Sequence, residues 1–596
     1  MDHFTELFTD VLVVGSGSAG AMAAIRAQSN GAEVVVVTKG PWPSGNSSKA
    51  LSGFAAAFGH ADPRDNPDVH FADVVRNGIG LCNQRLVRKW VDEICGLTEE
   101  MRGWGLDLIR SDGKYSQIPW EGHTFPRMVH HHRVTGKYLM KCLGAKSEAM
   151  GIKALSHTIV GGLFKREGQV NGAWAVNYQT GEIYLIRCKS VIMCTGGVGA
   201  MYPIGDNVGA VTGEGYALAF DAGAELTGME FGHFLASPIF PAKMQVKFVF
   251  IGFVNGLINE SNARLYNGLG ERFMFRYYPE TGEKRRSSEE LSRRIAEEIL
   301  AGRGGARGGI YFDASDVPAE FRDNDRYRRM YELADRAGMD LRRDPIELVT
   351  YPHDLVGGVK INELGRTNVP GLYAAGEAAG GSHGASRFGG SALSDCLVFG
   401  SASGIDAAAF SHQHTHHSEI DAAQLDQCRS KLDRWRQGKG TRPREVLDHL
   451  SQMAFRHLNM VRNESGLNAV LEDVSRLKST DLPGLSIVPG HEAPAVQMRE
   501  AIEAEGQTRL CELMAHAALE RRESRGGFFG GHYRTEYPAI DNEHWRKNIV
   551  LSICGNAIAI THEDPVLLDG LSSEIEQTIA TAWRPPNDPA HWAEAE

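Results

Sequence analysis

The sequence predicts an α/β fold, because short apolar runs that end near glycine alternate with helical patterns. Three such runs occupy residues 11–14, 190–193 and 372–375. A continuous apolar run of this length is typical of a strand that is buried on both faces of a sheet. Helical patterns at residues 21–27 and 393–399 follow the first and third runs. This alternation predicts a mostly parallel sheet covered by helices.

The first run leads into a glycine turn with a specific spacing. Residues 10–20 read DVLVVGSGSAG, and the glycines form the pattern G-x-G-x-x-G between a strand and a helix. In that context the glycines permit a tight turn and the close approach of a pyrophosphate at the helix N-terminus. The residues predicted to cradle the pyrophosphate are Gly15, Gly17, Ser18, Ala19 and Gly20.

The second strand of this unit, residues 33–37, ends without the acidic residue that usually holds a ribose. Thr38 and Lys39 stand there instead. The pattern therefore disfavours an NAD site, and the ribose needs another partner. Both residues are nevertheless placed among the predicted cofactor contacts.

Two further loops are rich in glycine and small polar residues. Residues 41–60 follow the second strand, and their backbone and hydroxyl groups are predicted to wrap a flavin and its ribityl chain; a solvated loop is the alternative. Residues 194–199 read CTGGVG and are predicted to close over the nucleotide half of the cofactor. The predicted contacts in these loops are Gly45, Asn46, Ser47, Ser52, Gly53, Thr195, Gly196 and Gly197.

Residues 371–400 are predicted to form a strand, a glycine-rich loop and a helix. The helix begins near Ser391, and the free N–H groups of a helix N-terminus attract negative charge. A reduced flavin carries negative charge at one edge of its ring. We therefore expect Gly390 and Ser391 to hold the flavin end of an FAD, and Arg387 to face the substrate. A contact from Arg387 to FAD itself is the alternative.

Composition narrows the class of protein. The 596 residues include 63 basic and 74 acidic side chains, and the net charge of −11 disfavours a nucleic-acid binder. The nine cysteines lack C-x-x-C spacing, so the sequence predicts no metal site and fits a reducing, cytoplasmic compartment. We find no secretory signal and no apolar run of about 20 residues, and expect no direct membrane span.

The character of the chain changes along its length. Residues 1–240 and 351–417 share the strand-and-glycine style and are predicted to form one domain in two parts. Residues 241–350 contain a charged helical segment and a Gly/Arg loop, which indicate an inserted domain. Residues 418–596 carry amphipathic helical patterns, which predict a helical C-terminal domain.

Taken together and in order, these motifs resemble the flavoprotein family of succinate dehydrogenase, fumarate reductase, L-aspartate oxidase and adenylylsulfate reductase. The pieces include GSGSAG, TGEGYALAFDAGAEL, HDLVGG, residues 371–400 and ESRGG. The resemblance implies a Rossmann-like FAD-binding domain with an inserted α+β capping domain and a helical C-terminal domain. It also implies that Glu377 lies at the ribose side of FAD, that Ser391 and Leu393 lie at the isoalloxazine edge, and that His353 and Arg387 bind a substrate carboxylate.

The sequence departs from this family at positions near the substrate. Leu235 stands where the succinate and fumarate enzymes have a substrate histidine, and His233 is a candidate substitute. Asn259 aligns with the arginine that delivers a proton, and Glu260 and Arg264 are nearby candidates for acid/base work.

The residues that follow the second strand carry one more departure. The respiratory members attach FAD through a histidine in S-H-T, and Gly45-Asn46-Ser47 lacks it. We therefore predict non-covalent FAD.

These observations predict an FAD-dependent oxidoreductase that transfers hydride between flavin N5 and a small anionic substrate other than plain fumarate or succinate. Three alternatives stay open: a flavoprotein like that of adenylylsulfate reductase, an L-aspartate-oxidase-like oxidase, and a flavoprotein that only relays electrons. An iron–sulfur or ferredoxin-like partner is expected to carry electrons, and oligomerisation is left open.

Overall fold

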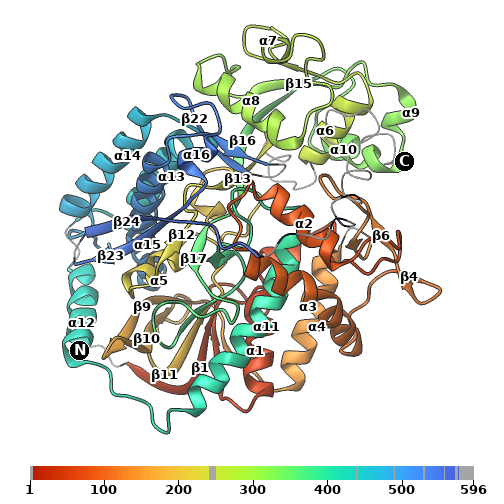
Figure 1. Ribbon diagram of the computed structural model, residues 1–596. Coiled ribbons are helices and arrows are strands. Elements are labelled where there is room, and N and C mark those ends of the chain that lie inside the picture. The colour runs from red at the N-terminus through yellow and green to blue at the C-terminus, as the bar shows by residue number, and fades with distance from the viewer. Residues whose placement is uncertain are drawn as a thin grey trace.

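The computed structural model describes residues 4–577 except 133, 241–249, 438–439, 489, 491, 528–529, 556, 569, 571–572, 574 and 576. Its first sheet has the strand order β8-β2-β1-β11-β10-β9, and β18 also pairs with β11 (Figure 1). The pairs β1–β2, β1–β11, β2–β8 and β11–β18 are parallel, as the sequence predicts. The strands are β1 (Thr5–Val14), β2 (Val34–Val37), β8 (Lys153–Leu155), β9 (Thr158–Arg166), β10 (Gln169–Asn177), β11 (Ile183–Met193) and β18 (Leu372–Ala374).

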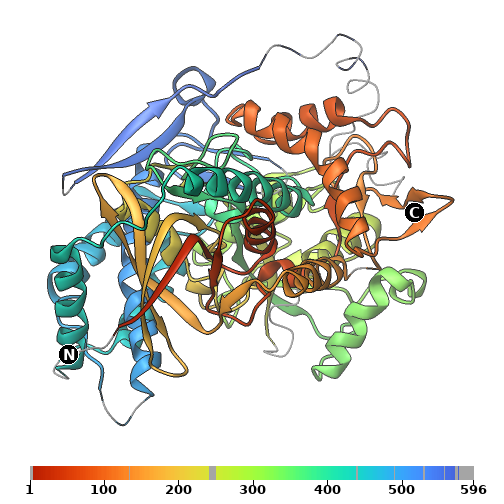
Figure 2. The same cartoon turned by 90° about the horizontal axis from the view of Figure 1, so that it is seen from below.

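Two helices pack against each other and against this sheet. They are α1 (Ser18–Ser29) and α11 (Ser391–His412), and they run side by side (Figures 1 and 2). Glycine makes the close approach possible, because a Cβ added at Gly400 or Gly404 would lie 2.5 Å from the carbonyl oxygen of Ala19 or 2.3 Å from that of Ala23. The contact fixes the starts of both helices relative to each other.

The capping domain, or cap, is built on a second sheet with the order β14-β15-β16-β13-β22-β20. In this sheet β14 is Arg264–Tyr266, β15 is Ile310–Asp313, β20 is Val461–Arg462 and β22 is Gly531–Arg534. Its helices include α6 (Phe250–Glu260), α8 (Ser288–Leu300) and α10 (Asp325–Arg336), and it has a hydrophobic core of its own (Figure 1). The strands β13 (Gly232–Phe240) and β16 (Ile346–Leu355) pair along most of their length. β13 ends at the predicted start of the cap, and β16 spans the predicted end of the cap at residue 350. This pair of strands therefore connects the cap to the cofactor domain. The predicted domain boundaries themselves stay predictions.

The C-terminal part begins with helices, as the sequence predicts, and ends with strands, which the sequence analysis missed. The helices are α12 (Ala422–Arg436), α13 (Pro443–His457), α14 (Glu464–Arg476) and α15 (Pro494–Glu520). Among the later strands, β22 (Gly531–Arg534) pairs with β13 of the cap, and β23 (Asn548–Cys554) pairs with β12 (Leu226–Thr227). The C-terminal part therefore contributes strands to two sheets that begin elsewhere in the chain.

A buried ionic cluster anchors this last part. Nε of Arg521 lies 2.7 Å from Glu230, and its Nη1 lies 2.9 Å from Glu523, while Arg525 also pairs with Glu523. All four side chains are fully buried. Buried charges of this kind persist only when they are paired, so the ESRGG motif has a structural role here. In the part of the chain that the structure describes, no helix is long and apolar enough to cross a membrane.

Candidate functional site

A pocket of about 830 Å³ lies where the parallel strands β1, β2, β11 and β18 end. The loops that follow these four strands all line it, and they contribute Gly15, Thr38, Thr195 and Glu377 among others. Ligands of open α/β sheets bind outside the carboxyl ends of the strands for this reason.

The glycine turn forms the floor of the pocket. Gly15 has φ +112°, and a Cβ there would lie 2.0 Å from the carbonyl oxygen of Cys194. A Cβ at Gly20 would lie 2.2 Å from the carbonyl oxygen of Gly15. Helix α1 begins at Ser18 with Gly17 as its N-cap, and its first turn holds no acidic residue. The positive end of the helix is therefore directed at the pocket, as a pyrophosphate requires.

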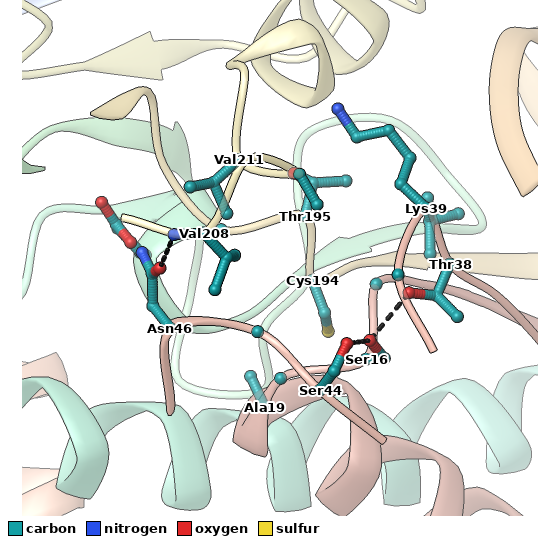
Figure 3. A pocket seen from close by; sticks show the side chains of 18 of the residues that line it. Ser16, Ala19, Thr38, Lys39, Ser44, Asn46, Cys194, Thr195, Val208 and Val211 are labelled. Atoms are coloured by element: carbon teal, nitrogen blue, oxygen red, sulfur yellow. Dashed lines mark hydrogen bonds between the residues drawn. The ribbon is translucent and has the colours of Figure 1, made fainter. Parts of the chain in front are cut away.

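The loop at residues 44–47 forms one side of the pocket (Figure 3). Ser16 Oγ lies 2.7 Å from Thr38 Oγ1 and 3.3 Å from Ser44 Oγ. Asn46 Oδ1 accepts a hydrogen bond of 2.8 Å from Val208 N, so this loop is joined to the segment after β11. These hydrogen bonds join the two sides of the pocket.

Lys39 is held by two acidic side chains. Its Nζ lies 2.8 Å from Glu214 and 3.3 Å from Glu503, and Figure 3 shows the side chain extending away from Ser16. Burial alone would lower the pKa of Lys39, but the two carboxylates outweigh it and raise the pKa above its usual value. Lys39 therefore stays charged as an internal ion-pair partner.

Glu214 is a pocket residue that the sequence analysis missed. It begins helix α5 (Glu214–Asp221) and lines the pocket. Its carboxylate pairs with Lys39 and accepts a hydrogen bond of 2.6 Å from Thr212 Oγ1, and as an acceptor at the pocket it is a candidate for the ribose role that the acid missing after β2 would have. The sequence does contain a signal for Glu214, because this residue lies in the TGEG segment on which the family resemblance partly rests.

The donor set fits an FAD. Thr195 Oγ1 and Ser391 Oγ are buried and have no hydrogen-bond partner among the residues that the structure describes. Ser391 opens α11, and its N-cap Gly390 has φ +80°. A Cβ at Gly197 would lie 1.8 Å from Glu377 Oε1, so glycine is required for Glu377 to reach the pocket. These are the groups expected around a polar, extended cofactor.

Most residues predicted to bind the cofactor line this pocket. They are Gly15, Gly17, Ser18, Ala19, Thr38, Lys39, Gly45, Asn46, Ser47, Thr195, Gly196 and Glu377. The others lie around it. Gly390 O accepts a hydrogen bond from Ala55 N at 3.2 Å, which brings the loop that holds Ser52 and Gly53 to the start of α11. Leu393 is buried in the first turn of that helix.

A second group of side chains meets where the cap joins the cofactor domain. His233 on β13 and Asp354 on β16 are opposite each other in the sheet, and His233 Nδ1 lies 3.1 Å from Asp354 Oδ1. His353 Nδ1 lies 2.7 Å from Asp206 Oδ2. The rings of His233 and His353 meet edge to face, with centroids 5.0 Å apart. Two histidine–carboxylate pairs therefore share one site.

Arg387 completes this group. Its Nε donates to Asp354 Oδ2, its Nη1 donates to the carbonyl oxygen of Phe388 at 3.0 Å, and its Nη2 lies 3.4 Å from His233 Nδ1. The structure thus brings together three of the five predicted catalytic residues: His233, His353 and Arg387. The two carboxylates between them were not predicted.

The site tunes its titratable groups in opposite directions. Burial lowers the pKa of His233 to about 4 despite the nearby Asp354. Burial would also lower the pKa of His353, but Asp206 outweighs burial and raises the pKa of that imidazole. Burial would raise the pKa of Asp354, but Arg387 and His233 outweigh it and hold that pKa well below the usual range. Burial and the charge of Asp354 raise the pKa of Glu377 to about 8.

The other two predicted catalytic residues make their described contacts inside the cap. Glu260 accepts a hydrogen bond from Tyr327, and Arg264 lies 2.8 Å from Asp316. Leu235 packs in the cap core, because a β-bulge follows His233 and turns the next residues. Asn259 donates to the carbonyl oxygens of Asn255 and Arg286 and has a structural role.

Comparisons with known proteins agree with this geometry. The FAD binding domain family matches residues 10–393, and the fumarate reductase flavoprotein C-terminal family matches residues 448–575. One subunit of the fumarate reductase (CoM/CoB) of Methanothermobacter marburgensis is 34% identical over 91% of this chain and 97% of its own length. L-aspartate oxidase of Streptomyces coelicolor is 28% identical over 91% of both chains.

A solved structure supports the same relationship across the whole fold. Sdh1 of Mycobacterium smegmatis, in complex with UQ1, has a TM-score of 0.86 and 30% identity, and the match covers 94% of this chain and 95% of that one. The first family match alone spans more than half of the chain. The fold class, the cofactor and the family predicted from the sequence are therefore confirmed. The chain is an FAD-dependent oxidoreductase and belongs to the flavoprotein family of fumarate reductase and succinate dehydrogenase.

Proposed function

We propose that this oxidoreductase transfers hydride between FAD and a small anionic substrate other than plain fumarate or succinate, bound beside Arg387, His353 and His233. The observation that carries the proposal is the convergence of these three side chains next to Glu377, a residue that lines the FAD pocket. Bound FAD supplies an acceptor or donor of hydride at N5. The guanidinium of Arg387 binds the negative group of the substrate.

The reaction also moves one proton. When the substrate is oxidised, one C–H bond gives up its hydrogen with both electrons, and a neighbouring atom loses a proton to the protein. When the substrate is reduced, both steps reverse. His353 fits the proton-transfer role, because Asp206 raises its pKa and orients its ring. His233 is neutral at pH 7 and suits a hydrogen-bonding role.

This assignment replaces two of the candidates from the sequence. Glu260 and Arg264 contact Tyr327 and Asp316 in the cap, so we propose structural roles for them. Leu235 packs in the cap core, so we propose that its side chain does not contact the substrate.

Fumarate itself is the second candidate substrate. A relative at 34% identity is named as part of a fumarate reductase, and Arg387 and His353 match the ligands expected for a carboxylate. L-aspartate is a third candidate, since a relative at 28% identity is named an L-aspartate oxidase. The ion pair between Arg387 and Asp354 favours a substrate that differs from fumarate.

The test compares two arginines. Arg387→Ala is expected to lower turnover by about 100-fold or more while FAD stays bound, since a charge-stabilising donor is lost. Arg264→Ala is the matched control and is expected to keep most of the activity, because Arg264 is about one third exposed at the cap surface. Equal activity of Arg387→Ala and the parent protein would remove Arg387 from the site.

The substrate class is tested on the reduced protein. Fumarate, adenylylsulfate, iminoaspartate and air are each added to reduced flavin, and the rate of reoxidation is followed by absorbance. Fast reoxidation by fumarate at low concentration would contradict a substrate other than fumarate. Fast formation of peroxide in air would support the oxidase alternative.

We also propose that an iron–sulfur or ferredoxin-like partner provides the route for electrons. The relative at 34% identity is itself named as one subunit of an enzyme, which supports a multi-subunit assembly. Affinity purification of the tagged chain from its native host tests this, with the iron and acid-labile sulfide of the co-purified protein as the readout. Recovery of the chain alone under gentle conditions would contradict the proposal.

A further inference from the structure

We infer that Asp354 sets the charge of the accepted substrate, favouring a carboxylate with one negative charge and a hydrogen-bond donor over a dicarboxylate. The inference rests on the proposed function, because it concerns the same site. The donor group is a hydroxyl or an ammonium. Asp354 acts as a specificity-determining residue through its ion pair with Arg387.

The carboxylate of Asp354 lies directly against Arg387, the residue that we propose binds the substrate anion. The side chain is about nine-tenths buried, and it lies between Arg387 Nε and His233 Nδ1. An arginine binds a carboxylate best when two of its N–H groups are presented as a fork. Here Nε is already engaged by Asp354 and Nη1 by the carbonyl oxygen of Phe388. A substrate carboxylate therefore competes with an internal anion for this guanidinium.

The charges around the site nearly cancel. Arg387 pairs with Asp354, and His353 pairs with Asp206, which raises the pKa of the imidazole, so both basic side chains already face a carboxylate. His233 is neutral, and the raised pKa of Glu377 keeps that side chain largely protonated at pH 7. A first substrate carboxylate then meets no unpaired cation among these groups, and a second carboxylate adds a further negative charge beside Asp354. Coulomb repulsion in a buried site makes the second charge costly.

Asp354 also offers an acceptor for a substrate donor. Its Oδ1 has no hydrogen bond of good geometry among the described residues, although His233 Nδ1 lies 3.1 Å away. An ionised carboxylate can accept several hydrogen bonds and donates none. A hydroxyl or ammonium on the substrate would satisfy Oδ1, whereas a second substrate carboxylate would face it with like charge.

The experiment titrates the oxidised holoenzyme with two ligands of matched length, malonate and 3-hydroxypropionate. The readout is the change in flavin absorbance, which gives a dissociation constant without turnover. The parent protein is expected to bind 3-hydroxypropionate more tightly than malonate. Asp354→Asn keeps the shape and the acceptor for Arg387 but removes the charge, and is expected to shift the ratio of the two constants by about tenfold toward malonate.

Asp206→Asn is the matched control. It also removes one buried negative charge, but Asp206 pairs with His353, whereas the arginine that we propose binds the substrate pairs with Asp354. The ligand ratio is expected to stay close to that of the parent. FAD content and thermal unfolding of each variant confirm that it is folded.

The outcomes are distinguishable. If Asp354 has only a structural role, Asp354→Asn would weaken the binding of both ligands equally and leave the ratio of their dissociation constants unchanged. That result would overturn the inference but not the proposed function. Tighter binding of malonate by the parent protein would do the same. If no carboxylate perturbed the flavin of any variant, the proposed function would fail together with the inference.

Discussion

His353 Nδ1 and Asp206 Oδ2 lie 2.7 Å apart and join two segments that are 147 residues apart in the sequence. Asp206 is buried, and the pKa of the neighbouring Tyr351 is raised by its own burial and by the charge of Asp206. Asn207 adds a hydrogen bond of 2.9 Å to the backbone carbonyl of His353. A histidine held in this way keeps its proton at higher pH than a free one, because the carboxylate stabilises the imidazolium.

The first prediction concerns the pH dependence of substrate reduction. A protonated His353 donates the proton, so the rate is full below the pKa of His353 and falls as pH rises through it. Asp206→Asn removes the group that raises this pKa. The alkaline limb of the pH–rate profile is therefore expected to move to lower pH. Stopped-flow reoxidation of reduced flavin by the substrate, measured from pH 5 to 9, checks this.

Asp316→Asn is the control for this measurement. Asp316 pairs with Arg264 in the cap, and its loss is expected to leave the profile unchanged. If Asp206→Asn and Asp316→Asn gave the same alkaline limb as the parent, His353 would not be the proton donor.

The second prediction concerns stability at the cofactor pocket. Lys39→Met removes the cation that Glu214 and Glu503 share, and leaves two buried carboxylates without it. Breaking a buried ion pair from one side typically costs about 3–5 kcal/mol of unfolding free energy. Urea unfolding of the FAD-loaded protein, followed by flavin and tryptophan fluorescence, measures the loss.

Lys89→Met is the matched substitution at an exposed pair. Lys89 lies 2.6 Å from Glu93 on helix α3 (Gln84–Gly103), and Glu93 is about half exposed. Surface pairs contribute about 0–1 kcal/mol. Similar losses from both substitutions would argue against a special role for the buried cluster. Adding Glu503→Gln to Lys39→Met is expected to restore part of the stability.

The local parts of this site could be predicted from the sequence, but its long-range contacts could not. The apolar runs and glycine turns predicted β1, β2, β11 and β18 and the pocket at their ends, because those signals depend on neighbouring residues. The pairing of His233 with Asp354 depends on the register of β13 against β16 and on the bulge beside it. The bulge also explains why Leu235 points into the cap core. Lys39 meets Glu503 across 464 positions, which no local pattern reveals.

The third prediction tests how Glu377 reaches the pocket. A Cβ at Gly197 would lie 1.8 Å from Glu377 Oε1, so Gly197→Ala must displace that side chain. FAD is expected to bind at least tenfold more weakly, since a displaced buried carboxylate costs more than about 1.4 kcal/mol. Gly96→Ala on α3 is the control, because a Cβ there has nothing within 4 Å. Equal flavin content of both purified variants would show that Glu377 can move without consequence.

The last prediction concerns how the flavin is attached. The family resemblance implies that respiratory members attach FAD through a histidine, and here Asn46 is at the corresponding place in the loop after β2. Both ends of its carboxamide are engaged, because Nδ2 donates to Asn207 Oδ1 and Oδ1 accepts from Val208 N at 2.8 Å. An amide is also a much poorer nucleophile than an imidazole. After acid precipitation of the purified protein, the yellow FAD is expected in the supernatant, as measured by absorbance and mass. Flavin retained on the protein in the pellet would refute non-covalent binding, and peptide mapping would then identify the attached residue.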